Sequence, residues 1–184
     1  MTLASPQRAQ QRILQTSFVV RDVYETAQAF LDVYSIGPWF IFEHYPFKDL
    51  KYRGSVATMD VTIAVSYSGT LMIELIQQHD DAPSAYKEVV AAHGYGFHHF
   101  AIPSHDYDKD LARYRKLGFE VVNEATAPGD HGDHRAAYLD TSARLPGLTE
   151  LMETVPDLMA ALKELETTAA DWDGTEPIRV HKFR

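Results

Sequence analysis

The sequence contains no cysteine, which excludes disulfide bonds and thiolate metal sites. Any metal ion would therefore be held by histidine, carboxylate or amide side chains. The sequence also lacks an apolar run long enough to cross a bilayer, and the segment before residue 13 lacks the apolar core of a secretory signal. From these absences we expect a soluble, cytoplasmic protein that does not associate with membranes.

Positive charge is scarce as well. The 184 residues include 17 Lys and Arg against 26 Asp and Glu, which gives a formal net charge of −9. Such a chain repels nucleic-acid phosphates, so a nucleic-acid partner is disfavoured. Hydrophobic residues make up 45% and charged residues 23%, which is typical of one compact domain or two small, closely packed halves.

The predicted elements follow one another in an order that occurs twice. Hydrophobic alternation, helical spacing and turn residues predict the first set as strand 14–20, helix 23–34, strand 39–43, loop 45–54, β stretch 56–67 and strand 71–77. After a connecting helix over 84–93, the second set comprises strand 97–102, helix 107–117 and strands 119–123, 135–140 and 148–154. A helix over 156–171 follows, and the last dozen residues are expected to be a tail or a docking arm.

A direct alignment of the two sets supports an internal repeat. An offset of 84 residues places Gln15 on His99 without a gap, and an offset of 76 places Glu74 on Glu150. Each half thus supplies one polar side chain early in its first strand and one glutamate in its last. We therefore predict a leader over 1–12, βαβββ modules over 13–80 and 97–155, a connector over 81–96, and a C-terminal helix and tail over 156–184.

Strand alternation places these four polar side chains on the inner face of the predicted sheet. On this pattern His98 points to the opposite face from His99. Buried carboxylates are costly unless something pairs with them, and a shared cation is the simplest partner. Each of the four, taken alone, also fits a hydrogen-bonded core residue or a surface glutamate. Their matched places in the repeat favour one metal site built from Gln15, Glu74, His99 and Glu150.

The modules and their motifs resemble the vicinal oxygen chelate superfamily, which includes glyoxalase I, methylmalonyl-CoA epimerase, extradiol dioxygenases and bleomycin-resistance proteins. The matching motifs are Leu14-Gln15-Thr16, Ile73-Glu74-Leu75, the segment from Gly96 to Ile102, and Thr149-Glu150-Leu151. The resemblance implies an α+β, glyoxalase-like fold, in which two paired βαβββ modules form a curved, partly open barrel with an added C-terminal helix. It also implies a homodimer.

The resemblance extends to the metal ligands. The superfamily's four ligands fall on Gln15, Glu74, His99 and Glu150, a set similar to that of zinc-type glyoxalases. The implied cofactor is one divalent ion, with zinc, nickel, cobalt, manganese and magnesium all open. The implied activity is that of an isomerase, epimerase or lyase that acts on a carbonyl or acyl-thioester substrate through an enolate-type intermediate. Glu150 is the first candidate for the catalytic base and Glu74 is the second.

The sequence differs from glyoxalase I at two positions that bind substrate, and two alternative functions stay open. Val19 and Tyr95 stand where glyoxalase I carries the basic residues that grip glutathione, so we expect a substrate without glutathione. The aromatic stretch over 39–52 suggests that the substrate is apolar or aromatic. One alternative is a metal-free, small-molecule-binding protein of the resistance type. The other is an extradiol-type dioxygenase, which Gln15 in place of a histidine disfavours.

Four further residues are predicted to bind substrate or to act as a lid. Trp39 and Phe42 belong to the aromatic stretch, while His131 and His134 lie in a loop rich in glycine and aspartate. The competing interpretations are core packing for the two aromatic residues and a solvated loop for the two histidines.

Overall fold

The computed structural model describes residues 11–129 and 132–181. In chain order, the elements are β1 (Gln15–Val19), α1 (Val23–Tyr34), β2 (Trp39–Phe42), β3 (Lys48–Tyr52), β4 (Ser55–Val56), β5 (Val61–Ser68), β6 (Leu71–Gln78), α2 (Ala85–His93), β7 (Gly96–Ser104), α3 (Tyr107–Lys116), β8 (Val121–Ala127), β9 (His134–Leu139), β10 (Leu148–Glu153), α4 (Pro156–Ala170) and β11 (Ile178–His181).

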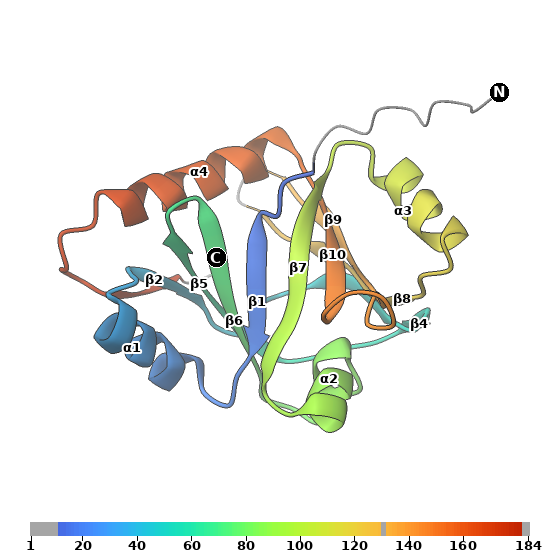
Figure 1. Cartoon of the computed structure of the whole chain (residues 1–184), viewed down its shortest axis with the longest axis horizontal. Coiled ribbons are helices and arrows are strands. Elements are labelled where there is room, and N and C mark those ends of the chain that lie inside the picture. Colours follow the sequence, from blue (N-terminus) through green and yellow to red (C-terminus); the bar gives the residue numbers. More distant parts are fainter. Residues whose placement is uncertain (1–10, 130–131, 182–184) are drawn as a thin grey trace.

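The strands form one mixed sheet in the order β11-β2-β5-β6-β1-β7-β10-β9-β8-β3-β4 (Figure 1). The two halves join where β1 pairs with β7 in antiparallel fashion. The two edge strands, β11 and β4, do not pair with each other in the described residues, so the sheet curves without closing into a barrel. The predicted α+β, glyoxalase-like fold is therefore confirmed.

The strand register reproduces the repeat in the sequence. Gln15 lies opposite Met72 in the parallel pair of β1 and β6. In the second half, His99 lies opposite Leu148 in the parallel pair of β7 and β10. Each of these partners is two positions before the glutamate of its half. The same two offsets that align the sequence therefore align the backbone.

The helices α1 and α3 cover equivalent parts of the outer face. Val23 and Ala27 of α1 pack with Leu75 of β6, while Leu111 of α3 packs with Leu151 of β10. Each helix begins after an aspartate cap, Asp22 or Asp106, whose side chain accepts backbone N–H hydrogen bonds. Because one face of β6 and of β10 packs against these helices, the other face of each strand points to the inner side of the curved sheet.

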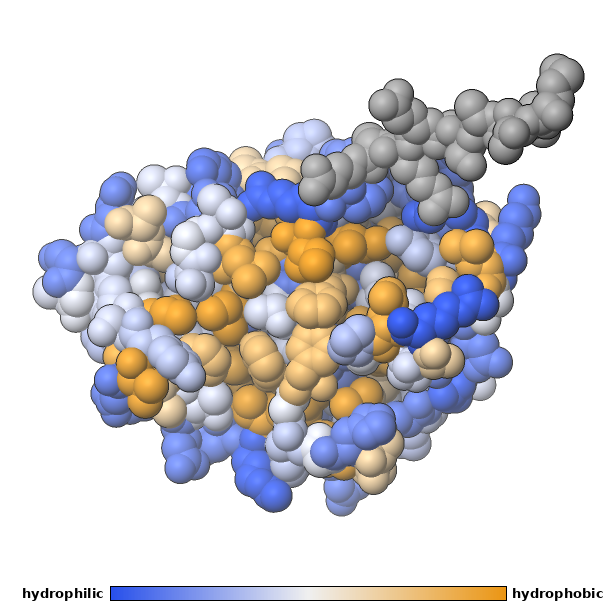
Figure 2. Space-filling model, in the orientation of Figure 1, coloured by the Kyte–Doolittle hydropathy of each residue, from blue (hydrophilic) through white to orange (hydrophobic). Residues whose placement is uncertain are grey.

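Between α1 and α3, the outer face of the sheet is lined by three aromatic rings. Phe97 packs edge-on against Phe18, with 6.1 Å between ring centroids, and lies 4.7 Å from Phe100. Figure 2 shows apolar side chains gathered over the middle of this face. The central strands are therefore apolar on their outer side as well as on their inner side.

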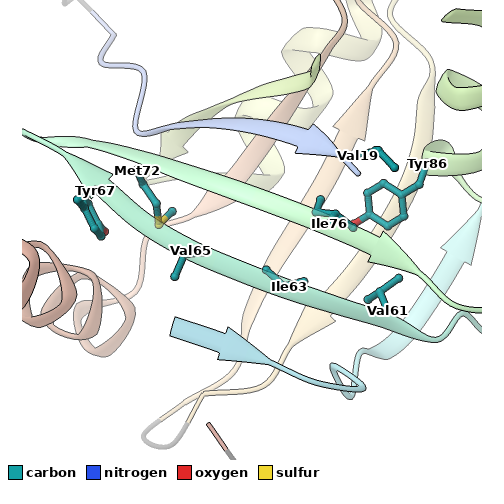
Figure 3. Close-up of a cluster of buried hydrophobic side chains, with 8 residues drawn as sticks. All are labelled: Val19, Val61, Ile63, Val65, Tyr67, Met72, Ile76 and Tyr86. Atoms are coloured by element: carbon teal, nitrogen blue, oxygen red, sulfur yellow. The ribbon is translucent and has the colours of Figure 1, made fainter. Parts of the chain in front are cut away.

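The inner face carries the largest apolar cluster, part of which is drawn in Figure 3. Ile63 and Val65 of β5 and Met72 and Ile76 of β6 belong to it. The helix α4 packs against β5 and is tethered where the Tyr67 hydroxyl donates to the carbonyl oxygen of Leu162 at 3.1 Å. The predicted C-terminal helix thus covers the inner side of the sheet.

Three predicted segments differ from the structure. The predicted loop over 45–54 is wrong, because it contains β3, which pairs with β8 of the other half and with the short strand β4. The strand predicted over 119–123 begins later, at Val121, because Phe119 still belongs to the turn that ends α3, where its N–H bonds the carbonyl of Tyr114. The final segment contains β11, which pairs with β2 as a docking arm. Most of the predicted leader lies outside the described residues.

No helix in the described ranges is both long enough and apolar enough to span a membrane.

Candidate active site

The four predicted ligands meet on the inner face of four adjacent strands. Gln15 on β1, Glu74 on β6, His99 on β7 and Glu150 on β10 are all buried. The Gln15 amide nitrogen donates to Glu74 Oε2 at 2.6 Å and lies 3.2 Å from His99 Nε2. His99 Nε2 in turn lies 3.6 Å from Glu74 Oε2 and 3.2 Å from Glu150 Oε2.

This cluster has more hydrogen-bond acceptors than donors. The Gln15 amide supplies two N–H groups, one towards Glu74 and one towards His99 Nε2. If His99 Nε2 accepts the second of these, it has no proton to give to Glu150. Glu150 Oε2 is buried and has no hydrogen-bond partner among the described residues. A buried carboxylate oxygen in that position is costly unless a positive charge comes to it.

Burial also changes the acidity of the cluster. It raises the pKa of Glu74 to about 7, an effect to which the charge of Glu150 adds and which the nearby His99 opposes. Desolvation disfavours the charged carboxylate, and a second carboxylate disfavours it further. Glu74 therefore holds or releases a proton near neutral pH.

His98 lies beside the cluster, not on the outer face as alternation predicted. The antiparallel register of β1 and β7 shifts between Ser17 and Phe18, so that His98 is an extra residue on β7. Such a bulge breaks the alternation of side chains. The ring of His98 is fully buried, with its Nδ1 2.8 Å from His99 Nδ1 and its centroid 5.2 Å from that of Tyr138.

The contact between the two histidines fixes the orientation of His99. Burial holds the pKa of His98 well below its usual value, so His98 is neutral, and a hydrogen bond of 2.8 Å joins its Nδ1 to Nδ1 of His99. When Nδ1 of His99 is the donor, Nε2 of His99 carries a lone pair on the side of Glu74 and Glu150. A histidine held through its second nitrogen in this way is the usual arrangement in metal sites.

A cavity of about 820 Å³ opens in front of the cluster. Gln15, Glu74 and Glu150 lie in its wall, and apolar side chains make up most of the remainder. The apolar lining includes Phe42, Tyr45, Phe47, Leu50, Met59, Ile63, Val65, Met72, Met152, Leu158, Leu162 and Leu165. Enclosure by apolar walls with a few convergent polar groups is typical of a small-molecule site.

The four predicted substrate-binding or lid residues have different outcomes. Phe42 and His134 line the cavity. The prediction for Trp39 is wrong, because alternation along β2 turns it into the core under α1, where it is fully buried and packs against Phe30. His131 lies outside the described residues.

His134 contributes a polar atom to the mostly apolar wall. Its Nδ1 is buried and has no hydrogen-bond partner among the described residues. Desolvation lowers the pKa of the ring, although Glu150 and Glu153 oppose that effect. A neutral imidazole with one unpaired nitrogen can accept or donate a hydrogen bond to a bound molecule.

Tyr86 and Tyr138 belong to the site but were not predicted. The two hydroxyls lie 2.9 Å apart, and the Tyr138 ring lies 4.7 Å from that of His99. Tyr138 faces Glu150 across the pair of β9 and β10, so strand pairing could have identified it. Tyr86 comes from α2, and no signal in the sequence links that helix to the cavity.

Comparison with known proteins identifies similar chains. Residues 14–138 match the family described as Glyoxalase/Bleomycin resistance protein/Dioxygenase superfamily. A search of curated proteins found no match. Among solved structures, a hypothetical protein from Bacillus halodurans, BH1468, is 18% identical, with a TM-score of 0.55, over 80% of this chain and 96% of that one.

Two methylmalonyl-CoA epimerases share the fold. The Mycobacterium tuberculosis enzyme is 18% identical, with a TM-score of 0.53, over 80% of this chain and 91% of its own. A Streptomyces coelicolor enzyme in complex with 2-nitronate-propionyl-CoA is 21% identical, with a TM-score of 0.53, over 80% of this chain and 99% of its own. At these identities the likeness extends to the fold.

Proposed function

The chain belongs to the Glyoxalase/Bleomycin resistance protein/Dioxygenase superfamily, and on that premise we propose that it is a divalent-metal-dependent isomerase, epimerase or lyase. Its substrate would be a carbonyl compound that reacts through an enolate-type intermediate. The observation that carries this proposal is the meeting of Gln15, Glu74, His99 and Glu150 beside a mostly apolar cavity, in whose wall Gln15, Glu74 and Glu150 lie.

The donor set fits a divalent cation. Two carboxylates, one imidazole nitrogen and one amide oxygen suit zinc, nickel, cobalt, manganese or magnesium. Glu150 Oε2, which has no hydrogen-bond partner among the described residues, and His99 Nε2 lie 3.2 Å apart, so one ion could contact both atoms. A positive ion there would satisfy the surplus of acceptors.

The side chains are drawn together by direct contacts. As they stand, no three His, Asp or Glu side chains of the described segments form a group spaced to hold a metal ion. Binding would therefore replace the hydrogen bond from Gln15 to Glu74 and turn the amide oxygen of Gln15 inwards. It would also displace the proton that Glu74 holds near neutral pH, because metal ligands bind in their deprotonated form.

The cation would supply Lewis-acid stabilisation of negative charge on the carbonyl oxygen of the substrate. Glu150, whose Oε2 has no hydrogen-bond partner among the described residues, would remove the proton from the neighbouring carbon and return it. Glu74 is the second candidate for that role. The unpaired Nδ1 of His134 would orient a polar group of the substrate, and the apolar lining would exclude water from the reacting carbon.

The direct test is exchange of the proton next to a carbonyl in heavy water, followed by proton NMR. We expect the purified protein with added Zn²⁺, Ni²⁺, Co²⁺, Mn²⁺ or Mg²⁺ to accelerate exchange in one member of a panel of ketones, 2-oxoaldehydes and acyl thioesters. A chelator should stop the acceleration. Glu150→Gln should lower the exchange rate by roughly 100-fold or more, the usual order for loss of a general base.

The control for this test is His44→Gln, a change on an exposed residue outside the cavity, which should leave the exchange rate unaltered. The proposal would be wrong if no member of the panel exchanged in a metal-dependent way, or if Glu150→Gln and Glu74→Gln both exchanged at the wild-type rate.

A further inference from the structure

One wall of the cavity is built by a part of the chain that lies beyond the family match. The match ends at residue 138, whereas α4 and β11 begin at Pro156 and Ile178. In Figure 1, α4 lies lengthwise along one side of the curved sheet, and the chain then returns to add β11 beside β2. Both elements contribute side chains to the cavity.

The α4 wall is mostly apolar and is fixed in place. Leu158, Leu162 and Leu165 line the cavity, at the spacing of one helical face. The hydrogen bond from the Tyr67 hydroxyl to the carbonyl of Leu162 attaches the middle of the helix to β5. Met159 lies on another face of α4 and is 37% exposed.

The charges around the cavity are unfavourable for an anion. Among the described residues that line it, Lys48 is the only Lys or Arg, and its ammonium group is paired with Asp133 at 2.8 Å. The acidic side chains in the lining are Glu74, Glu150, Asp157 and Glu164. Recognition of a phosphate requires cationic or N–H donors, so the phosphates of a coenzyme A thioester would meet repulsion here.

We propose that α4 and β11 restrict this site to compact, uncharged and largely apolar carbonyl compounds, aromatic ketones included, and exclude coenzyme A thioesters. Leu158, Leu162 and Leu165 are the residues that set the size of the substrate. This inference rests on the proposed function. The proposed catalytic residues could act on ketones or on acyl thioesters, and the inference narrows the substrate to the ketone class. The cavity of about 820 Å³ is within the usual range for small-molecule sites.

Binding of two probes tests this inference. The full chain, with one equivalent of Zn²⁺, is titrated with 2-acetylnaphthalene, followed by the fluorescence of the probe, and separately with propionyl-CoA, followed by calorimetry. We expect the naphthyl ketone to bind at least tenfold more tightly than propionyl-CoA. Leu162→Trp fills the cavity from α4 and should weaken ketone binding at least tenfold. Met159→Trp adds the same ring on an exposed face of the helix and should change binding by less than twofold.

Circular dichroism and thermal unfolding establish that each variant is folded. If Leu162→Trp does not fold, Ala161→Leu, which adds a smaller side chain to the same wall, replaces it with the same expected direction. The inference is overturned if propionyl-CoA binds as tightly as the ketone, if neither probe binds, or if the folded wall variant binds the ketone like the wild type. Because this assay measures binding without turnover, its failure is distinct from a failure of proton exchange.

Discussion

Glu74 is the residue at which burial and charge oppose each other most directly. Its side chain is buried, it accepts from the Gln15 amide at 2.6 Å, and its pKa is raised to about 7. The ordinary pKa of a glutamate is near 4.5. In the metal-free protein, the folded state therefore binds a proton more tightly than the unfolded state does between these two values.

This difference predicts the direction of a pH dependence. Because the folded state holds the extra proton, the free energy of unfolding should fall as the pH rises from about 5 to about 7, by at most about 1.4 kcal/mol per pH unit. Glu74→Gln removes the titrating group and should flatten that slope. Urea unfolding of chelator-treated protein at several pH values measures both slopes. An equal slope in the wild type and the variant would contradict the assignment.

The meeting of the four polar residues was predictable from the sequence, whereas the positions of their neighbours were only partly so. Gln15, Glu74, His99 and Glu150 followed from two repeat offsets and strand alternation, which are local properties of the chain. The position of His98 was not predictable, because it depends on a register shift between β1 and β7. The prediction for Trp39 was wrong because the identity of an aromatic residue in a strand does not show which face of the sheet it occupies.

Among the elements, the turn between β9 and β10 contacts the strand that carries two histidines of the site. Gly147 in this turn has a φ of +69°, and a Cβ there would lie 2.5 Å from the carbonyl oxygen of His98. Backbone of this kind favours glycine, and the close approach leaves no space for a methyl group. The turn thus packs directly against the strand that carries His98 and His99.

We therefore expect Gly147→Ala to destabilise the protein by more than the roughly 1 kcal/mol that a strained φ costs alone. Gly69→Ala is the matched control, because Gly69 has a φ of +60° but a methyl group added there would meet nothing within 4 Å among the described residues. Chemical unfolding of both variants gives the two values. Equal losses of stability would show that the contact with His98 adds nothing.

Elements with a local signal were predicted, and those that depend on distant partners were not. The capped helices α1 and α3 and the alternating strands β1, β6 and β10 lie close to their predicted ranges. By contrast, β3 pairs with β8 in the other half of the chain and with the two-residue strand β4, and β11 pairs with β2. Short, polar segments of this kind resemble loops until their partners are known.

At the scale of the whole molecule, the site depends on the joining of two equivalent halves. Each half supplies one glutamate and one polar side chain from its first strand, and the antiparallel pair of β1 and β7 brings the two sets together. The C-terminal segment then adds the wall that the two modules lack. The homodimer implied by the family resemblance stays a prediction.

Calorimetric titration of the chelator-treated protein with Zn²⁺ shows whether four side chains from these halves hold one divalent cation. We expect one ion per chain, at least a tenfold loss of affinity in both His99→Ala and Glu150→Gln, and unchanged affinity in the exposed control His44→Gln. Absence of binding by Zn²⁺ and by Ni²⁺, Co²⁺, Mn²⁺ and Mg²⁺ in turn, or equal affinity in all three variants, would mean that the four side chains do not form a cation site.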